Sequence, residues 1–250
     1  MSLFDTFDPD SEEIVTPSAM HHPVEGFPET VIMTFKEKTF QVLEDIFQPT
    51  VVATLHEGWS VPIYKLRWKD KEIGAMQTVI GGAGTAGLME EILVMGAKKV
   101  LIYGSCGVLD SALTAGHFIL PTKAYRDEGV SYHYLPISDY VDIPTVEKLG
   151  TIFDEMNLPY VKGRVWTTDG FYRETRNNME KRKADGCIAV DMECASAMAV
   201  AQFRGAEVYQ FLYAADSLDE VTWDPRALEK AQMSDYEQYL RIALEVAARL

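Results

Sequence analysis

The sequence predicts a single α/β domain in which helices flank a central mixed β-sheet. Apolar runs of strand length alternate with segments of helix length from residue 30 onwards, as in folds built on a largely parallel sheet. With 250 residues and 47% hydrophobic content, the chain is long enough to form one large core. No internal repeat or low-complexity linker divides it.

The N-terminal half begins with a predicted arm. Residues 1–27 are polar, acidic and contain proline, so we expect them to lie outside a domain that spans residues 28–250. A strand is predicted over 30–35 and an amphipathic helix over 40–47. Residues 61–80 predict a hairpin that turns near 69–71. The glycine cluster GGAGTAG (81–87) then opens a helix that ends at Gly96.

The C-terminal half continues the alternation. Residues 98–108 predict a strand that runs into a glycine-rich turn, GSCG (104–107), and residues 117–126 predict another strand. We expect strand then loop over 163–171, mostly helix over 180–205, strand then loop over 206–219, and helix over 227–250. In such folds ligands bind beyond the carboxyl ends of the strands, where the glycine-rich and acidic turns fall here.

Charge and composition exclude several classes of protein. A formal net charge of −15 and a pI near 4.7 argue against a surface for nucleic acid or anionic membrane. The three cysteines, Cys106, Cys187 and Cys194, lack metal-ligand spacing and predict core residues in a reducing compartment. The acidic N-terminus lacks the features of a signal peptide, and no apolar run approaches the roughly 20 residues of a membrane helix. We therefore expect a cytoplasmic protein.

Two stretches carry carboxylates in unusual surroundings. Asp191 and Glu193 stand in AVDMECASA (189–197), a run that is otherwise small and apolar. Buried carboxylates are costly unless they are paired, so either this stretch is less buried than its neighbours indicate or it binds a ligand. Asp216, in AADSLD (214–219), follows a predicted strand. It either caps the next segment or serves as a general acid or hydrogen-bonding group toward a substrate.

Glycine-rich and aromatic stretches supply further candidates, each with a purely structural alternative. The amides beside Ser105 in GSCG suit an anion, but a tight turn needs no ligand. GGAGTAG is neither a P-loop nor a good dinucleotide fingerprint, and helix packing explains it as well; a ligand there would be an anion or polar group. In TTDGFYRET (167–175), Phe171 suits stacking on a heterocycle and Tyr172 a sugar contact, or both anchor a surface loop.

Taken together, these stretches resemble a known family. VLIYGSCGVLD, TTDGFYRET, AVDMECASAMAVAQFRGAE and AADSLD occur in the order and approximate spacing of the nucleoside phosphorylases, which include uridine phosphorylase and the bacterial hexameric purine nucleoside phosphorylases. The resemblance covers residues 28–248. It implies one α/β domain with a central mixed sheet that cleaves the N-glycosidic bond of a nucleoside.

The resemblance also implies roles at the sugar. Glu193 would accept hydrogen bonds from the ribose hydroxyls, Met192 would pack against the sugar, and Tyr172 would lie beside it. One of the two arm histidines, His21 or His22, would reach the ribose of a neighbouring subunit, and His22 is the one we predict. That role implies a homo-oligomer based on dimers, up to a hexamer. The role of Asp191 stays open.

The resemblance also implies contacts to the base and to the phosphate co-substrate. Phe171 would stack on the base, Arg176 would read its edge, and Asp216 would protonate it if burial raised its pKa. Ser105 and Gly104 would contact phosphate. A purine is favoured by Asp216, but an Asp alone does not exclude a pyrimidine.

The chain departs from the family where phosphate binds. The phosphorylases have Gly-Asp-Pro-x-Arg after the first strand, whereas residues 33–39 here are MTFKEKT, and Ile102 stands where they carry an arginine three residues before the turn serine. Arginine is well suited to phosphate, so other cations must replace it or water is the acceptor. Candidate replacements are Lys36, Lys38, Lys65, Arg67 and Arg126. Glu37 would activate water in a hydrolase.

The base-reading loop departs as well. Uridine phosphorylases have a Gln and an Arg after Phe-Tyr, and this chain offers Arg176 or Asn177 without the Gln. The sequence nonetheless predicts a uridine phosphorylase-like enzyme that uses phosphate as co-substrate, without metal or cofactor, to release free base and ribose 1-phosphate. The alternatives are a nucleosidase that uses water and a nucleoside-binding protein that has lost catalysis.

Overall fold

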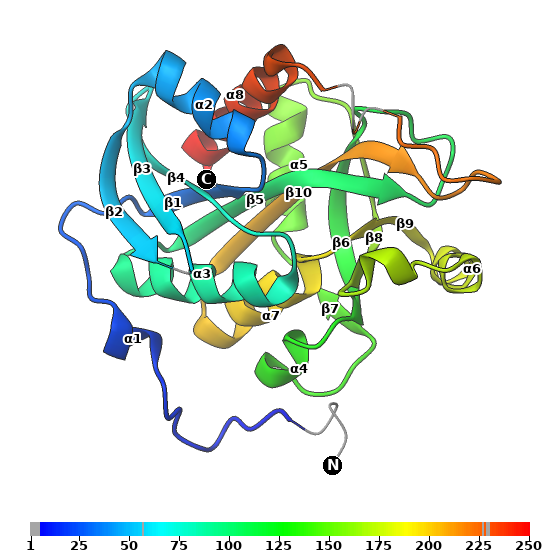
Figure 1. Cartoon of the computed structure of the whole chain (residues 1–250), viewed down its shortest axis with the longest axis horizontal. Helices are drawn as coiled ribbons and strands as arrows, with labels where there is room; N and C mark the ends of the chain where they lie inside the picture. Colours follow the sequence, from blue (N-terminus) through cyan, green and yellow to red (C-terminus); the bar gives the residue numbers. More distant parts are fainter. Residues whose placement is uncertain (1–5, 57, 227, 229–230) are drawn as a thin grey trace.

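The computed structural model describes residues 6–56, 58–226, 228 and 231–250, and contains a ten-stranded mixed sheet with helices packed around it (Figure 1). Its strands are β1 (Thr30–Thr34), β2 (Thr50–His56), β3 (Ser60–Trp68), β4 (Lys71–Gln77), β5 (Lys99–Val108), β6 (Phe118–Asp127), β7 (Tyr140–Asp142), β8 (Tyr160–Thr168), β9 (Cys187–Asp191) and β10 (Glu207–Ser217). Its helices are α1 (Pro17–Met20), α2 (Glu37–Phe47), α3 (Gly82–Met95), α4 (Ser131–Tyr134), α5 (Val146–Glu155), the 3₁₀ turn η2 (Phe171–Arg173), α6 (Arg176–Ala184), α7 (Cys194–Arg204) and α8 (Met233–Arg249). The predicted α/β class is confirmed.

Strand β5 organises the sheet. It pairs in parallel with β1 and, along its whole length, with β10, while its last two residues pair antiparallel with β9. Strands β10, β6, β8 and β9 thereby close a ring with β5, and β1, β4, β3 and β2 extend the sheet to one side. Because β5 and β9 overlap only near their ends, the carboxyl ends of both strands meet at one place.

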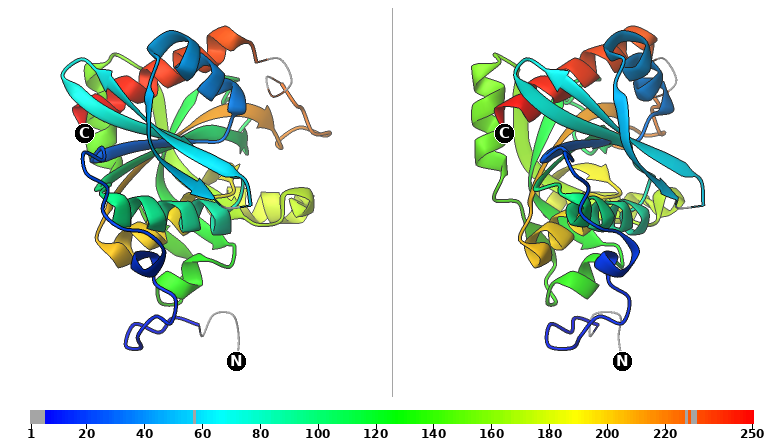
Figure 2. Two further views of the ribbon diagram at one scale, coloured as in Figure 1. Left: turned by 60° about the vertical axis from the view of Figure 1, so that its left-hand side comes forward. Right: turned by 90° about the vertical axis from the view of Figure 1, so that its left-hand side faces the viewer.

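Two layers of helices cover the sheet (Figures 1 and 2). Helices α2, α5 and α8 lie on one side, and α3, α4 and α7 lie on the other. Helix α2 packs on α8, and α3 packs on α7. The central strands are buried on both faces, which explains their continuous apolar runs. Fully buried side chains of these strands include Ile32, Leu101, Ile102 and Phe211.

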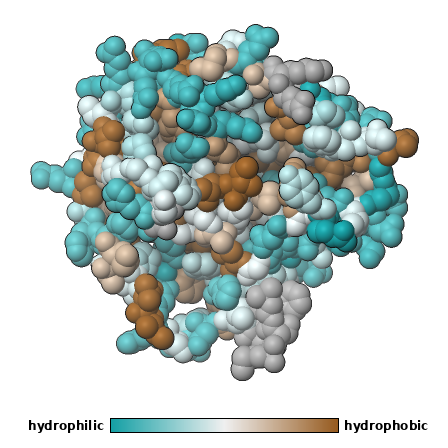
Figure 3. Space-filling model, in the orientation of Figure 1, coloured by the Kyte–Doolittle hydropathy of each residue, from teal (hydrophilic) through white to brown (hydrophobic). Residues whose placement is uncertain are grey.

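The described part of the arm runs along α3, α7 and α4 (Figure 2). The Val24 amide donates to the Met95 carbonyl at 3.0 Å, and Glu13 pairs with Arg204 of α7 at 2.6 Å. The division between arm and domain at residue 27 stays a prediction. The face shown in Figure 3 is largely polar, with apolar side chains exposed in small separate groups. Within the described residues, no helix combines the length and apolarity needed to cross a membrane.

Most predicted elements are confirmed, including the first strand, the helix after it, the hairpin, and the helix that ends at Gly96. Strand β2, strand β7 and helices α1, α4 and α5 were not predicted. The C-terminal helix begins at Met233 rather than at residue 227, and residues 227, 229 and 230 lie outside the described residues.

Three predictions at strand ends were wrong. The stretch 104–107 is not a turn, because Gly104 and Ser105 pair with β10 and Gly107 pairs with both β10 and β9. Asp216 lies within β10 rather than in a loop after it. Residues 187–191 form a strand rather than a helix, because helix α6 ends before Asp185-Gly186 and the following residues insert between β8 and β5.

Candidate active site

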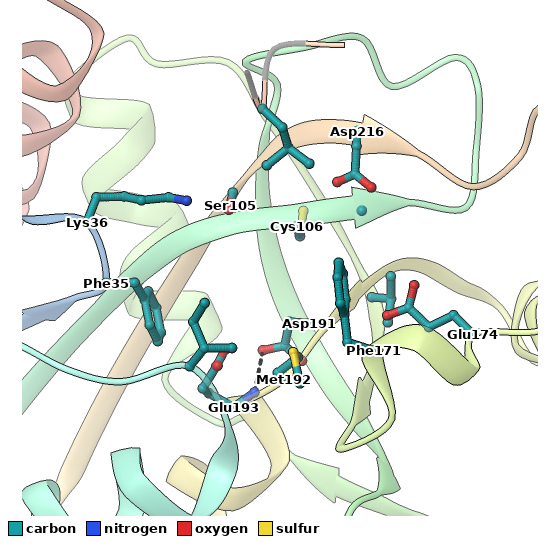
Figure 4. Close-up of a pocket in the computed structure, with 14 residues that line it drawn as sticks. Phe35, Lys36, Ser105, Cys106, Phe171, Glu174, Asp191, Met192, Glu193 and Asp216 are labelled. Atoms are coloured by element: carbon teal, nitrogen blue, oxygen red, sulfur yellow. Dashed lines mark hydrogen bonds between the residues drawn. The ribbon is translucent and has the colours of Figure 1, made fainter. Parts of the chain in front are cut away.

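A cavity of about 210 Å³ lies where the ends of β1, β5, β9 and β10 meet η2 (Figure 4). Five of the residues predicted to act on a substrate line this cavity, which we call the inner cavity: Ser105, Phe171, Met192, Glu193 and Asp216. They come from segments far apart in the chain, and the sheet brings them together. The position at the carboxyl ends of strands is the one that the fold class predicts for a ligand.

Glu193 is held at the sugar end of the predicted site. It lies between β9 and α7, is 6% exposed, and accepts a hydrogen bond from the Gly81 amide at 2.7 Å. Burial raises the pKa of its carboxyl group to about 8, and the charge of Asp191 adds to the effect. Gly81 immediately precedes α3, so the polar group that the glycine cluster holds in this structure is a carboxyl group of the protein itself.

Asp191, whose role the sequence left open, serves the structure around Glu193. Its carboxylate accepts hydrogen bonds from the Thr167 hydroxyl at 2.7 Å, the Cys194 amide at 2.8 Å and the Gln210 side chain at 3.2 Å. Burial raises its pKa, while these donors favour the charged form. Asp191 therefore ties β8, β10 and the start of α7 together and fixes where Glu193 begins its helix.

The predicted base end contains two acidic side chains. Asp216 accepts a hydrogen bond from the Trp223 indole N–H at 2.7 Å, and burial raises its pKa. Glu174 lines the same cavity, and burial followed by the charge of Asp216 raises its pKa to about 7. Sequence reasoning missed Glu174. The available signal was its place three residues after Phe171, which a single turn of 3₁₀ helix brings to the same side.

At the predicted phosphate end, the side chain of Lys36 extends toward Ser105 (Figure 4). Among the described residues that line the inner cavity, Lys36 is the one lysine or arginine. Gly104 does not line the cavity. The Phe35 ring packs on its backbone, so a Cβ atom at Gly104 would lie 2.8 Å from two ring carbons. Ile102, at the position of the family's arginine, is fully buried in the core.

The other candidate cations and Glu37 lie outside this cavity. Lys38 lies over the Tyr236 ring at 5.8 Å. The Arg126 guanidinium donates to the Ser131 hydroxyl and the Pro136 carbonyl, both at 2.7 Å. Lys65 bonds the Gly26 carbonyl and Arg67 the Lys69 carbonyl. Glu37 is exposed at the start of α2. Arg126 is therefore committed to its own loop, and Glu37 has no position from which to activate water in this cavity.

A second, outer cavity of about 280 Å³ adjoins the inner one and shares Phe171 and Glu174 with it. Tyr172 and Arg176 line only this outer cavity. Tyr172 is 93% exposed, and the Arg176 guanidinium donates to the carbonyls of residues 218, 220 and 221. These contacts clamp α6 to the loop after β10. Neither Tyr172 nor Arg176 therefore lies in the inner cavity with Glu193 of the same chain.

His22 also lies apart from the cavity. It is exposed on the arm, next to His21, whose ring nitrogen lies 3.2 Å from the Glu91 carboxylate. Its predicted contact with a neighbouring subunit stays a prediction. Among the described residues, no group of three or more His, Cys, Asp or Glu side chains is arranged to hold a metal ion.

A family model described as the phosphorylase superfamily matches residues 31–250. The chain belongs to the phosphorylase superfamily. The resemblance noted from the motifs is thereby confirmed. Within the superfamily, the DeoD-type purine nucleoside phosphorylase of Caldanaerobacter subterraneus is 25% identical over 184 residues, which are 72% of this chain and 78% of that protein.

Two solved structures share the superfamily fold. The purine nucleoside phosphorylase of Toxoplasma gondii, in complex with immucillin-H, gives a TM-score of 0.73 at 20% identity and covers 95% of this chain and 97% of its own. The AMP nucleosidase of Bacteroides thetaiotaomicron gives 0.71 at 19% identity and covers 89% and 88%. At these identities the two structures bear on the fold alone.

Proposed function

We propose that this protein cleaves the N-glycosidic bond of a purine nucleoside with inorganic phosphate, releasing the free base and a pentose 1-phosphate. The observation that carries the proposal is one cavity whose three ends differ in chemistry. Glu193 and Met192 lie in one part of it, Lys36 and Ser105 in another, and Phe171 with Asp216 in a third (Figure 4). Membership in the phosphorylase superfamily supports the same reaction.

At the sugar, Glu193 is the proposed acceptor for the ribose hydroxyls. Cleavage at the anomeric carbon passes through a state with oxocarbenium character, and orienting the sugar hydroxyls in that state lowers the barrier. The Gly81 amide, which donates to Glu193 at 2.7 Å, fixes the carboxyl group in place before substrate binds. Met192 lines the cavity beside it and offers an apolar surface to the sugar.

At the base, Phe171 is the proposed stacking partner and Asp216 the proposed polar contact. The electron pair of the broken C–N bond passes to the base, so an acidic proton at this end assists departure. The relative reported above is a purine enzyme, which supports a purine substrate. The uridine-type prediction lacks comparable support, because the Arg176 guanidinium that was to read a pyrimidine is engaged with backbone carbonyls.

At the phosphate end, Lys36 and Ser105 are the proposed ligands. A lysine supplies a positive charge and a serine hydroxyl supplies a donor, which together meet one face of a phosphate. The bound phosphate would then attack the anomeric carbon through one oxygen while its remaining charge lies against Lys36. This arrangement is poorer in cations than one built from several arginines, so we expect weak phosphate binding.

Hydrolysis is the second candidate, and one observation favours it. Lys36 is the single lysine or arginine among the described cavity residues, and the Phe35 ring fills the space beside Gly104. An apolar ring and one cation suit a neutral water better than a phosphate dianion. In this case water would take the place of phosphate, and the same sugar and base contacts would act.

We also propose that the protein works in the cytoplasm as a homo-oligomer. All three cysteines are buried and free, which fits a reducing compartment. Exposed His22 on the arm is available to a neighbouring copy.

Release of free base from inosine, adenosine and uridine, with and without phosphate, tests the proposal. We expect phosphate-dependent release from the purine nucleosides. The variant Glu193→Gln should lower kcat/KM by about 100-fold or more, whereas Glu180→Gln, an exposed change on α6, should leave it unaltered. Release that does not depend on phosphate would establish hydrolysis instead, and no release from any nucleoside would refute both candidates.

A further inference from the structure

Glu174 is an acidic side chain of the cavity to which the proposed reaction assigns no part. It follows η2 directly and lines both the inner and the outer cavity. Figure 4 shows its carboxyl group directed inward on the same side as Phe171 and Asp216. Within the described part of the chain, no hydrogen-bond donor or cation pairs with it, and its electrostatic neighbour is Asp216.

Asp216 differs from Glu174 in having a fixed donor. The indole N–H of Trp223, at 2.7 Å, can only donate, so the Asp216 oxygen that it meets must accept. A donated hydrogen bond favours the charged form of a carboxyl group, and a second carboxyl group nearby is then driven to its neutral form. Burial raises the pKa of both groups at the base end, but the Trp223 donor opposes this effect at Asp216, whereas the charge of Asp216 adds to it at Glu174, whose pKa is raised to about 7.

The surrounding charges leave this arrangement intact. Arg176 shares the outer cavity with Glu174 but directs its guanidinium to the carbonyls of residues 218, 220 and 221. Lys36 lies on the opposite side of the inner cavity, beside Ser105 (Figure 4). Asp191 and Glu193 line the sugar end and have donors of their own. No described cation therefore neutralises Glu174.

We propose that Glu174 is the catalytic acid of this site, which protonates the departing base while Asp216 stays ionised and orients that base by accepting a hydrogen bond. This role rests on the proposed function. The proton passes from the Glu174 carboxyl group to a ring nitrogen as the C–N bond breaks and its electron pair moves to the base. The acceptor oxygen of phosphate forms the new bond to the anomeric carbon. Glu174 is left as a carboxylate and regains a proton from solvent through the outer cavity.

A nucleoside whose base leaves without being protonated distinguishes an acid role of Glu174 from a structural role. Turnover of inosine would be compared with that of inosine methylated on N7, whose cationic base leaves without protonation, in wild-type protein, Glu174→Gln and the exposed control Glu180→Gln. We expect Glu174→Gln to lower kcat with inosine by about 100-fold or more and to change kcat with the methylated nucleoside by less than about threefold. It should also abolish the fall in wild-type activity above about pH 7, and Glu180→Gln should change nothing.

A titration that does not depend on turnover completes the test. Carbon NMR of protein labelled at the glutamate carboxyl groups should show two groups that titrate well above the ordinary range, Glu193 near pH 8 and a second group near pH 7. The second signal should disappear in Glu174→Gln and move to lower pH in Asp216→Asn.

Three results would overturn the role of Glu174 alone, provided that the wild-type protein releases base. They are an ordinary carboxyl titration, an unchanged pH profile in Glu174→Gln, and equal losses with both nucleosides. No base release from wild-type protein would refute the proposed function and, with it, this role.

Discussion

Asp191 and Glu193 are two residues apart, yet their carboxyl groups are held by different contacts. Asp191 is surrounded by donors from β8, β10 and α7, whereas Glu193 has the Gly81 amide and faces a cavity. The sequence identified both as buried carboxylates that needed partners. It left the role of Asp191 open because Thr167 and Gln210, which bond it, are distant in the chain and carry no recognisable spacing.

Replacing Asp191 should destabilise the protein markedly. In Asp191→Ala, three buried donors lose their acceptor and α7 loses an N-terminal partner. We expect the free energy of unfolding to fall by about 3 kcal/mol, measured by urea denaturation. The matched control Asp45→Ala removes an exposed carboxylate from α2 and should change it by less than about 0.5 kcal/mol. Equal effects of the two changes would contradict the bonding assigned to Asp191.

Glu193 should make stability depend on pH. Its carboxyl group titrates at about 8 in the folded protein against an ordinary value of 4.5, so the folded state holds a proton that the unfolded state releases between these values. The stabilisation from that proton is complete below the lower value and is lost as pH rises through the higher one. Glu193→Gln keeps an acceptor for the Gly81 amide and removes the titration. Relative to wild type, the variant should therefore gain at least about 1 kcal/mol of unfolding free energy on going from pH ~5 to pH ~9. A constant difference across this range would contradict the raised pKa.

Lys36 should govern the affinity for phosphate. In Lys36→Met, the cavity loses its described cation, and we expect KM for phosphate to rise by about tenfold or more. KM for the nucleoside should change little, because Lys36 lies beside Ser105, across the cavity from Phe171 and Asp216 (Figure 4). Lys181→Met, on the exposed surface of α6, is the control. Steady-state kinetics with each substrate varied in turn would measure both constants, and an unchanged KM for phosphate would refute the assignment.

At the scale of elements, the contact between α3 and α7 fixes the distance from the Gly81 amide to Glu193. Gly82, the first residue of α3, meets Ser196 of α7, and a Cβ atom there would lie 2.2 Å from the serine hydroxyl oxygen. A side chain at this position is therefore excluded by packing. The sequence predicted a helix that the glycine cluster opens, and it weighed packing against a ligand. In the structure, packing at Gly82 holds the Gly81 amide against the Glu193 carboxyl group.

Substituting alanine at two glycines of α3 separates packing from helix propensity. Gly82→Ala should lower the free energy of unfolding by about 1–3 kcal/mol and reduce nucleoside affinity, because α3 must move away from α7. Gly87→Ala, where a Cβ atom meets nothing within 4 Å, should instead raise it by about 0.5–1 kcal/mol. Thermal or urea unfolding of both variants gives the comparison. A stabilising effect at Gly82 would show that the two helices tolerate a wider separation.

The element that sequence patterns described worst is β9. Residues 187–191 were predicted as helix because the small apolar residues on both sides form one continuous run. A strand of five residues is too short for its hydrophobic pattern to be distinguished from that of a buried helix. Its partners are strands β8 and β5. Tertiary pairing decides such a segment. Pairing with β10 likewise places residues 104–107 in a strand.

For the whole molecule, the sequence was most informative about the fold and about which stretches meet. The alternation of strands and helices predicted the α/β class, and the motifs predicted five residues that line one cavity. It could not predict that Tyr172 and Arg176 face an outer cavity, because a 3₁₀ turn and a helix start redirect them. Glu174 lies in TTDGFYRET, but the resemblance gives this position no role, so the sequence did not single it out.

The central claim is that this cavity transfers a pentose from a purine base to phosphate. Phosphorus NMR of a reaction that contains wild-type protein, inosine and inorganic phosphate observes that transfer directly. The account predicts loss of the inorganic phosphate signal and growth of one sugar phosphate ester signal, in step with release of hypoxanthine and abolished in Glu193→Gln. Release of hypoxanthine with the inorganic phosphate signal unchanged would contradict phosphorolysis.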